Sequence, residues 1–272
     1  MVAGAVLGVT KQASAQTGVV TKPAEMPPPT APVLTPQNNA DAEAIQTAIS
    51  NYRDPKALKV VPVGQDWANL RRYHQANDDA KASPAPARKV VMMGDSITDS
   101  WPGLSNGFFP QNGLVGRGIS GQTTAQMVVR FWPEVVELKP QVVHILAGTN
   151  DIAENLDPYD FDQTTRNLMA MAAMARANGI RVVMGSVPPA TSFGWRLERG
   201  NPSALIKALN DWIQTYCRKN GLVYADYWPG LANTDGGLKA ELGLDSVHPN
   251  AAGYAVMGPV ALGAIAAAQK KV

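Results

Sequence analysis

Cysteine, histidine and net charge are all scarce in this sequence, and each shortage excludes a class of protein. The single cysteine among the 272 residues, Cys217, cannot form an internal disulfide. It lies beside an apolar-periodic run over residues 205–216, which favours packing in a core. Three histidines are too few for a typical zinc site, and the spacing of Asp95, Asp99 and Asp151 fits no calcium loop. We therefore expect no metal site.

The balance of charge predicts no nucleic-acid partner and no anionic membrane surface. The chain has 24 basic and 22 acidic side chains, which gives a net charge of +2. Adjacent basic residues occur only as short pairs such as Arg71-Arg72, so the sequence shows no basic patch. The apolar run near the N-terminus is too short to cross a bilayer, and we expect no stable membrane anchor.

Two common motifs are missing or incomplete. G-x-S-x-G, the nucleophile elbow of the α/β hydrolases, is absent. G-x-G-x-x-G is present at Gly116, Gly118 and Gly121, but a dinucleotide site also needs a clear preceding strand and an acidic residue about 20 positions later. Here the predicted strand covers only residues 114–115, and no suitably placed acid follows. We expect Gly116 and Gly118 to provide backbone freedom at the strand exit, and Gly121 to serve another chemistry.

The N-terminal region differs in composition from the rest of the chain. Residues 1–15 combine a short apolar run with a small-x-small pattern, which predicts a signal peptide and a periplasmic or secreted protein. Residues 16–40 are rich in proline and predict a stiff linker. Residues 41–87 predict a helical extension packed on the main domain, with helices over residues 41–52 and 66–81.

From residue 88 onward, short apolar runs alternate with helical patterns. These runs are partly β-branched and predict buried parallel strands. They cover residues 89–93, 114–115, 142–146, 181–184 and 222–225. Asn178-Gly179 and Asn220-Gly221 are typical of helix C-caps that turn the chain back into a strand. Residues 88–272 therefore predict a single α/β domain with a doubly wound, five-stranded parallel sheet flanked by helices.

Four polar clusters follow the predicted strands. In such a sheet, ligands bind beyond the carboxyl ends of the strands. Residues 94–96 follow the first strand, residues 118–121 the second and residues 148–151 the third. Residues 245–248 come after the fifth strand and a loop. We expect all four clusters to converge on one rim of the sheet.

These clusters contain the parts of a serine nucleophile. Ser96 is predicted on a tight strand-to-helix turn, and its hydroxyl needs an adjacent base. His144 lies inside a predicted strand and His74 in the extension, which leaves His248. Asp245 can hold the imidazole of His248 and stabilise its charge. Each cluster taken singly could equally be a helix cap or a polar loop, and only their combination predicts catalysis.

The four clusters resemble the sequence blocks of a known family. In order along the chain they read GDSITDSW, GISGQTT, GTNDIAEN and DSVHPNAAGY. These are similar to the blocks of the SGNH hydrolases, also called GDSL esterases and lipases, and in particular to bacterial acylhydrolases of lysophospholipase-like or acetylhydrolase type. The resemblance covers about residues 88–268. It implies the flavodoxin-like SGNH fold, and an oxyanion hole formed by the backbone N–H groups of Ser96 and Gly121 and the side-chain amide of Asn150.

Aromatic and basic side chains near the rim predict where substrate binds. The loop after the fourth predicted strand holds Phe193, Trp195 and Arg196, and Trp101 follows the Ser96 turn. Trp195 could stack on a sugar or an aryl leaving group, or it could pack beneath its loop. Arg196 could meet an anionic substrate. We interpret all four as candidate substrate-binding residues.

The sequence as a whole predicts a serine esterase that needs no cofactor. We expect it to remove short acyl groups, in particular acetyl, from small molecules or carbohydrates through an acyl-enzyme intermediate. Two alternatives remain open at this point. One is a lysophospholipase that acts on longer acyl chains, and the other is a non-catalytic carbohydrate-binding protein with the same fold. The oligomeric state is not predicted.

Overall fold

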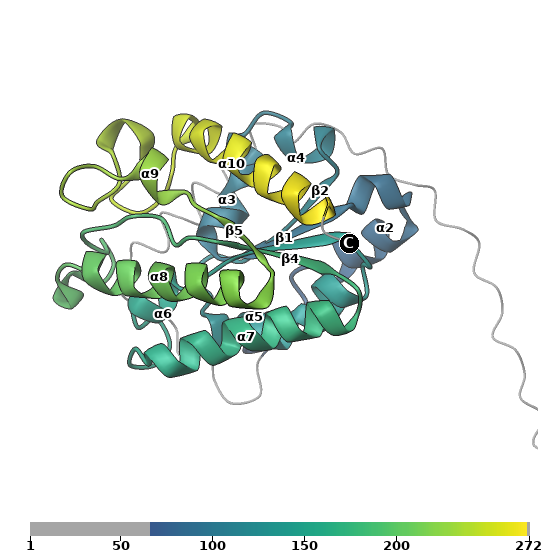
Figure 1. Cartoon of the computed structure of the whole chain (residues 1–272), viewed down its shortest axis with the longest axis horizontal. Coiled ribbons are helices and arrows are strands. Elements are labelled where there is room, and N and C mark those ends of the chain that lie inside the picture. Colours follow the sequence, from purple (N-terminus) through teal and green to yellow (C-terminus); the bar gives the residue numbers. More distant parts are fainter. Residues whose placement is uncertain (1–65, 271–272) are drawn as a thin grey trace, which may run out of the picture. The chain divides into compact units, whose positions relative to one another are not determined.

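The structure is a computed structural model, and residues 66–270 are described (Figure 1). The predicted signal peptide, the predicted proline-rich linker and the helix predicted over residues 41–52 lie outside the described residues. The described part contains residues 66–87 of the predicted extension and residues 88–270 of the predicted α/β domain.

Every predicted strand is present, and four of the five lie within one residue of their predicted bounds. The strands are β1 (Val90–Gly94), β2 (Leu114–Gly118), β3 (Val142–Leu146), β4 (Arg181–Gly185) and β5 (Val223–Ala225). The helices are α2 (His74–Ala82), α3 (Ser96–Leu104), α4 (Phe108–Gln111), α5 (Thr124–Phe131), α6 (Thr149–Ile152), α7 (Phe161–Ala177), α8 (Ser203–Asn220), α9 (Trp228–Leu231) and α10 (Ala251–Lys270). A π-helical turn, Trp132–Val136, extends α5.

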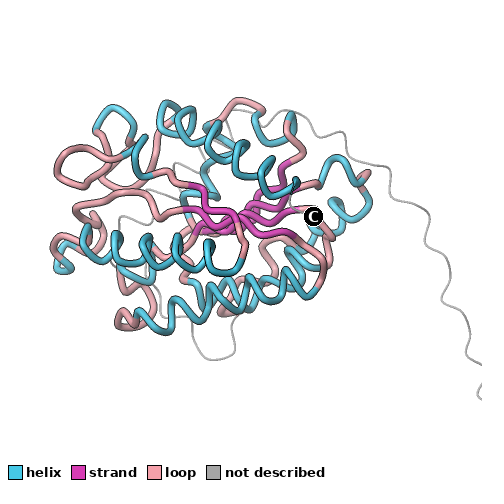
Figure 2. Tube along the Cα trace, viewed as in Figure 1, coloured by secondary structure: helices cyan, strands magenta, loops and turns pink. Residues whose placement is uncertain are grey.

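The strands form one parallel sheet in the order β2-β1-β3-β4-β5. Helices cover both faces: α3, α4 and α10 lie on one side of the sheet, and α5, α7 and α8 on the other (Figures 1 and 2). This is the doubly wound, flavodoxin-like order, so the predicted fold is confirmed. The direction in which successive strands are added to the sheet reverses at β1, which has β2 on one side and β3 on the other, and the loops that leave the carboxyl ends of β1 and β3 meet at a single rim.

The apolar strands are explained by burial on both faces of the sheet. Alternate residues of β1 point to opposite sides, so that Val91 and Met93 join the core beneath α5, α7 and α8. Val90 and Met92 join the core beneath α3 and α10. All of these side chains are buried, which is why the sequence shows continuous apolar runs instead of an alternating pattern.

β2 is longer than predicted, and the roles predicted for two of its glycines are wrong. The strand continues through Gly116 and Gly118, and neither residue has a positive φ. A Cβ at Gly118 would lie 2.1 Å from the backbone nitrogen of Asp99, so glycine is required there because α3 packs directly on the strand. A Cβ at Gly116 would lie 3.2 Å from Pro102. Close packing, and not conformational freedom, explains both glycines.

The extension is less helical than predicted. Residues 67–73 form successive turns, and α2 begins only at His74. Asn69 has a φ of +55°, which no α-helix accommodates. The backbone N–H of Arg71 donates to the carboxylate of Asp66 at 2.8 Å and stabilises the turn. Ser83 ends the helix in an extended conformation before Pro84.

α10 combines an apolar composition with a place in the core. Among the described residues it is the one helix long and apolar enough to cross a membrane. Its contacts include β3, β4 and β5 as well as α3 and α9, and Tyr254, Met257, Ala261 and Ile265 are buried. The helix therefore covers one face of the sheet and completes that core.

Candidate active site

The turn between β1 and α3 places Ser96 at the rim of the sheet. Asp95 is the N-cap of α3, and its Oδ1 accepts a hydrogen bond from the backbone N–H of Ile97 at 3.0 Å. A Cβ at Gly94 would lie 2.1 Å from Oγ1 of Thr98, so this tight turn requires glycine. Ser96 is the first residue of the helix, where the helix dipole favours negative charge.

Ser96, His248 and Asp245 come together although the chain separates the first from the other two. Oγ of Ser96 lies 2.9 Å from Nε2 of His248, and Nδ1 of His248 lies 2.9 Å from Oδ2 of Asp245. Oδ1 of Asp245 also accepts the backbone N–H groups of Val247 at 2.8 Å and His248 at 2.7 Å, which fixes the turn. Because a carboxylate only accepts, Nδ1 carries the proton and the lone pair of Nε2 faces the serine hydroxyl.

The surroundings of this contact favour charge separation. Burial alone would raise the pKa of Asp245, but its hydrogen bond to His248, the charge of His248 and the two backbone N–H groups outweigh burial. They hold the pKa of Asp245 well below its usual range, so the carboxylate stays ionised and can stabilise an imidazolium. The His248 side chain is only 5% exposed, and the ring of Trp195 lies 5.7 Å from it.

The other two histidines are placed elsewhere, as expected from the sequence. His144 is fully buried in β3, where its Nε2 lies 2.7 Å from the hydroxyl of Tyr227. Burial lowers the pKa of His144 to about 4, so this ring is neutral. His74 is exposed at the start of α2. Among the described contacts, His248 is the histidine that reaches Ser96.

The loop between β2 and α5, residues 119–123, brings Gly121 next to Asn150. Gly121 has a φ of +76°, a conformation that favours glycine. Nδ2 of Asn150 donates to the carbonyl of Gln122 at 3.1 Å, and Nδ2 of Asn155 donates to the carbonyl of Gly121 at 3.3 Å. Two of the predicted oxyanion-hole donors therefore lie on adjoining segments.

Asn155, which the sequence reasoning did not single out, fixes the orientation of the Asn150 amide. Nε1 of Trp195 can only donate, and it lies 2.8 Å from Asn155, so the Asn155 atom that faces it must be Oδ1. Nδ2 of Asn155 then faces Asn150 at 2.7 Å, and the atom there must be the oxygen of Asn150. The Asn150 nitrogen is left as a donor, with one proton for Gln122 and one remaining.

The predictions for the substrate-binding aromatic residues need correction. Trp101 and Phe193 are 0% exposed, so neither can contact a ligand. Trp101 stacks on Phe108 and Tyr254 in the core beneath α3, because the face of α3 that carries Trp101 is directed toward the core. Trp195 is 6% exposed and packs on Phe193 while its indole holds Asn155. It borders the site through the ring of His248.

Arg196 is the one member of the predicted substrate-binding set with a substantially exposed side chain. Its side chain is 30% exposed, and its guanidinium donates to the carbonyl of Glu154 at 2.8 Å and lies 3.4 Å from the Glu198 carboxylate. The structure thus shows Arg196 paired with protein groups. Its contact with an anionic substrate stays a prediction.

The pKa of Asp95, the residue directly before Ser96, leads to a test of how burial affects charge at this turn. Burial raises the pKa of Asp95 to about 7, against an ordinary 3.8, although the Ile97 N–H and nearby His248 lower it. Between these values the folded protein binds the proton and the unfolded chain does not, so the stability falls as the pH rises from about 4 to 7. Asp95→Asn cannot ionise and its oxygen can still cap Ile97. We expect the free energy of unfolding of Asp95→Asn, relative to that of the wild type, to increase from pH 4 to pH 8.

Chemical denaturation at several pH values measures this difference, since comparison with the wild type cancels other groups that titrate in the same range. A difference between the two proteins that is independent of pH would show that Asp95 titrates normally.

Comparisons with known proteins agree with this geometry. A sequence model of the GDSL-like lipase/acylhydrolase family matches residues 92–256, which is more than half of the chain. The chain therefore belongs to this family, and the resemblance to SGNH hydrolases is confirmed. It is a carboxylic ester hydrolase.

Individual relatives support the same assignment. Esterase TesA of Pseudomonas aeruginosa is 27% identical over 181 residues, which cover 61% of this chain and 81% of that protein. A GDSL-like lipase from Bacteroides thetaiotaomicron, known from its crystal structure, is 38% identical with a TM-score of 0.70, over 74% of this chain and 98% of that one. An acetylxylan esterase from Geobacillus stearothermophilus shares the fold at 19% identity and a TM-score of 0.52, over 65% of this chain and 94% of that one.

Proposed function

We propose that the chain hydrolyses short-chain acyl esters, acetyl esters above all, and that Ser96, His248 and Asp245 act as its catalytic triad. The observation that carries this proposal is the continuous contact from the serine hydroxyl through the imidazole to the carboxylate. Together with the Asn150 amide and the backbone N–H groups of Ser96 and Gly121, it supplies a nucleophile, a base and donors for an oxyanion.

The reaction takes place in two halves. Oγ of Ser96 attacks the ester carbonyl carbon while Nε2 of His248 takes the hydroxyl proton. The carbonyl oxygen becomes negative and accepts hydrogen bonds from the donors around Gly121 and Asn150. Collapse of this intermediate breaks the bond to the alcohol, which leaves with the proton from His248. Water then attacks the acyl-enzyme and gives a proton to His248. Collapse of the second intermediate breaks the bond between the acyl carbon and Oγ, His248 returns its proton to Oγ, and the carboxylic acid and free Ser96 are released.

Two features of the site support a short acyl group. The rings of Trp101 and Phe193 could have lined a channel for a long acyl chain, but each is buried in one of the two hydrophobic cores on either face of the sheet. The indole of Trp195 is held against His248 by its hydrogen bond to Asn155, so it limits space on the side of the base. Carbohydrate acetyl esters are suitable substrates for a test, since the fold is shared with an acetylxylan esterase.

A chain-length profile tests the proposal. With 4-nitrophenyl acetate, butyrate and octanoate, we expect kcat/KM to be highest for acetate and to fall about tenfold or more by octanoate. Acetylated xylooligosaccharides and a lysophospholipid, assayed beside them, test the natural ester. A value of kcat/KM that rises with chain length would favour the lysophospholipase alternative, and glycan affinity without any ester hydrolysis would favour the non-catalytic one.

A further inference from the structure

The described part of the extension packs against the loop that carries Gly121. Residues 66–77, here called the N-terminal segment, precede the region that matches the family, which begins at residue 92. The backbone carbonyl of Ala68 accepts a hydrogen bond from Nε2 of Gln122 at 2.8 Å, and that of Trp67 accepts one from Nε2 of Gln126 at 3.0 Å. Gln122 is the residue directly after Gly121.

The same segment holds the start of the loop. The hydroxyl of Tyr73 donates to the carbonyl of Gly118, the last residue of β2. Arg72 pairs with Asp99 at 3.1 Å, and the other oxygen of Asp99 accepts both the backbone N–H of Ser120 at 3.2 Å and its hydroxyl at 2.9 Å. The N-terminal segment thus contacts the chain, directly or through Asp99, immediately before and after Gly121.

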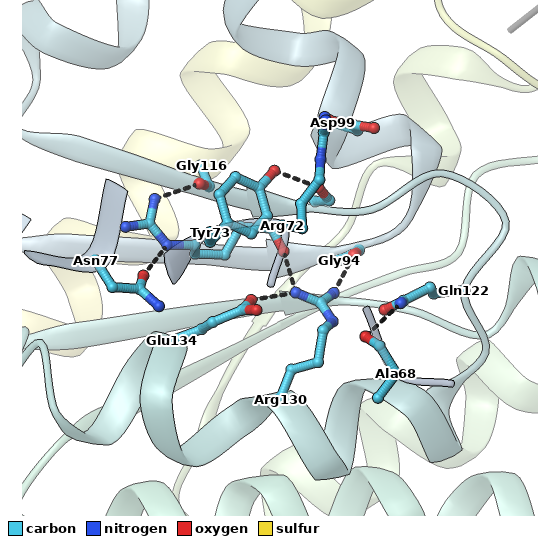
Figure 3. A network of polar contacts seen from close by, with 12 residues as sticks. Ala68, Arg72, Tyr73, Asn77, Gly94, Asp99, Gly116, Gln122, Arg130 and Glu134 are labelled. Carbon is cyan, nitrogen blue, oxygen red and sulfur yellow. Dashed lines mark hydrogen bonds and ion pairs between the residues drawn. The ribbon is translucent and has the colours of Figure 1, made fainter. Parts of the chain in front are cut away.

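Two buried basic residues, Arg117 and Arg130, extend these contacts, and Figure 3 shows Arg130 beside Glu134 and Gly94. Nε of Arg117 donates to Asn77 at 2.8 Å, and its guanidinium lies 4.8 Å from the centre of the Tyr73 ring. Arg130 is fully buried, pairs with Glu134, and donates to the carbonyls of Arg117 at 3.3 Å and of Gly94 at 3.2 Å. The ends of β1 and β2 and the N-terminal segment are therefore parts of one polar network. Burial raises the pKa of Tyr73 to about 12, so its hydroxyl remains a donor.

We propose that the N-terminal segment, with Tyr73 as its main contact, positions the loop over residues 119–123 so that the Gly121 N–H points at the oxyanion. This inference rests on the proposed function, because it requires Gly121 to stabilise the tetrahedral intermediate. Asn150 and Asn155 also hold the loop, through the carbonyls of Gln122 and Gly121. With the loop fixed by both sets of contacts, the N–H direction is set before substrate arrives, which is the condition for effective oxyanion stabilisation.

The decisive variant is Tyr73→Phe, which removes the hydroxyl and keeps the ring beside Arg117. We expect kcat for 4-nitrophenyl acetate to fall roughly tenfold with KM changed less than about twofold, because only a donor used in the transition state is misplaced. The affinity for phenylboronic acid, which forms a tetrahedral adduct with a catalytic serine, should fall by a similar factor. Tyr216→Phe in α8, far from this loop, is the matched control and should retain wild-type values.

The outcomes separate this inference from the proposed function. Wild-type kcat and boronic-acid affinity in Tyr73→Phe, even with a lower melting temperature, would show that the segment only stabilises the fold and would overturn the inference. A wild-type enzyme whose ester hydrolysis does not depend on Ser96 would instead overturn the proposed function. A tenfold loss in kcat at an unchanged melting temperature supports positioning, since lost stability alone does not produce it.

Discussion

A Ser96→Ala enzyme is expected to lose about 10⁴-fold or more in kcat/KM for 4-nitrophenyl acetate while it stays folded. In the proposed mechanism Ser96 forms the acyl-enzyme, and in this variant the imidazole of His248, 2.9 Å from Oγ in the wild type, has no serine hydroxyl left to activate. The residual rate would come from binding and from the oxyanion donors alone. Steady-state kinetics beside a melting curve measure both quantities.

Ser105→Ala is the matched control for this variant. Ser105 lies at the C-terminal end of the same helix, α3, so the substitution makes the same chemical change outside the site. We expect its kcat/KM to stay within about twofold of the wild type. Retention of several per cent of the activity by Ser96→Ala would mean that another nucleophile operates.

Asn150→Ala is expected to lower kcat by ~10²–10³-fold with little change in KM. The amide nitrogen of Asn150 donates one proton to the carbonyl of Gln122, and in the proposed mechanism it donates the other to the negative oxygen that develops in the transition state. The loss should be smaller than that of Ser96→Ala, because two backbone donors remain. Asn150→Asp should be at least as slow, since it replaces the N–H donor by a carboxylate, whose negative charge repels that of the oxyanion.

Asn178→Ala, at the C-terminal end of α7, makes the same change far from the rim and should behave as the wild type. An Asn150→Ala enzyme with raised KM and unchanged kcat would show that the amide binds ground-state substrate and does not stabilise the oxyanion.

The fold can be predicted from the sequence because each strand and each helix end is marked by residues that lie within it. Buried parallel strands need apolar residues on both faces, as Val90 to Met93 show, and the Gly179 and Gly221 caps mark where helices return to strands. The rule that ligands bind beyond the carboxyl ends of parallel strands then predicts from the sequence alone that Ser96 and His248 lie on one rim. β2 was underestimated because its second half, rich in glycine, carries no apolar signal.

The burial of individual side chains cannot be predicted in the same way. Arg130 and Glu134 are four residues apart on a helical pattern, the spacing of an ordinary surface ion pair, yet both are fully buried. Trp195 lies on a polar loop, which favours an exposed ring, but its indole proton needs an acceptor and finds Asn155. Such contacts depend on which distant segments meet, and that information is not contained in local spacing.

Covalent labelling of the nucleophile tests the central claim most directly. After incubation with a serine-directed fluorophosphonate and cleavage at Lys89 and Arg117, we expect the label on the peptide of residues 90–117, with fragment ions that assign it to Ser96 and not to Ser100 or Ser105. Labelling should abolish ester hydrolysis in proportion to its extent. A label on Ser120, in the following peptide, or full activity in a protein completely labelled at Ser96 would contradict the account.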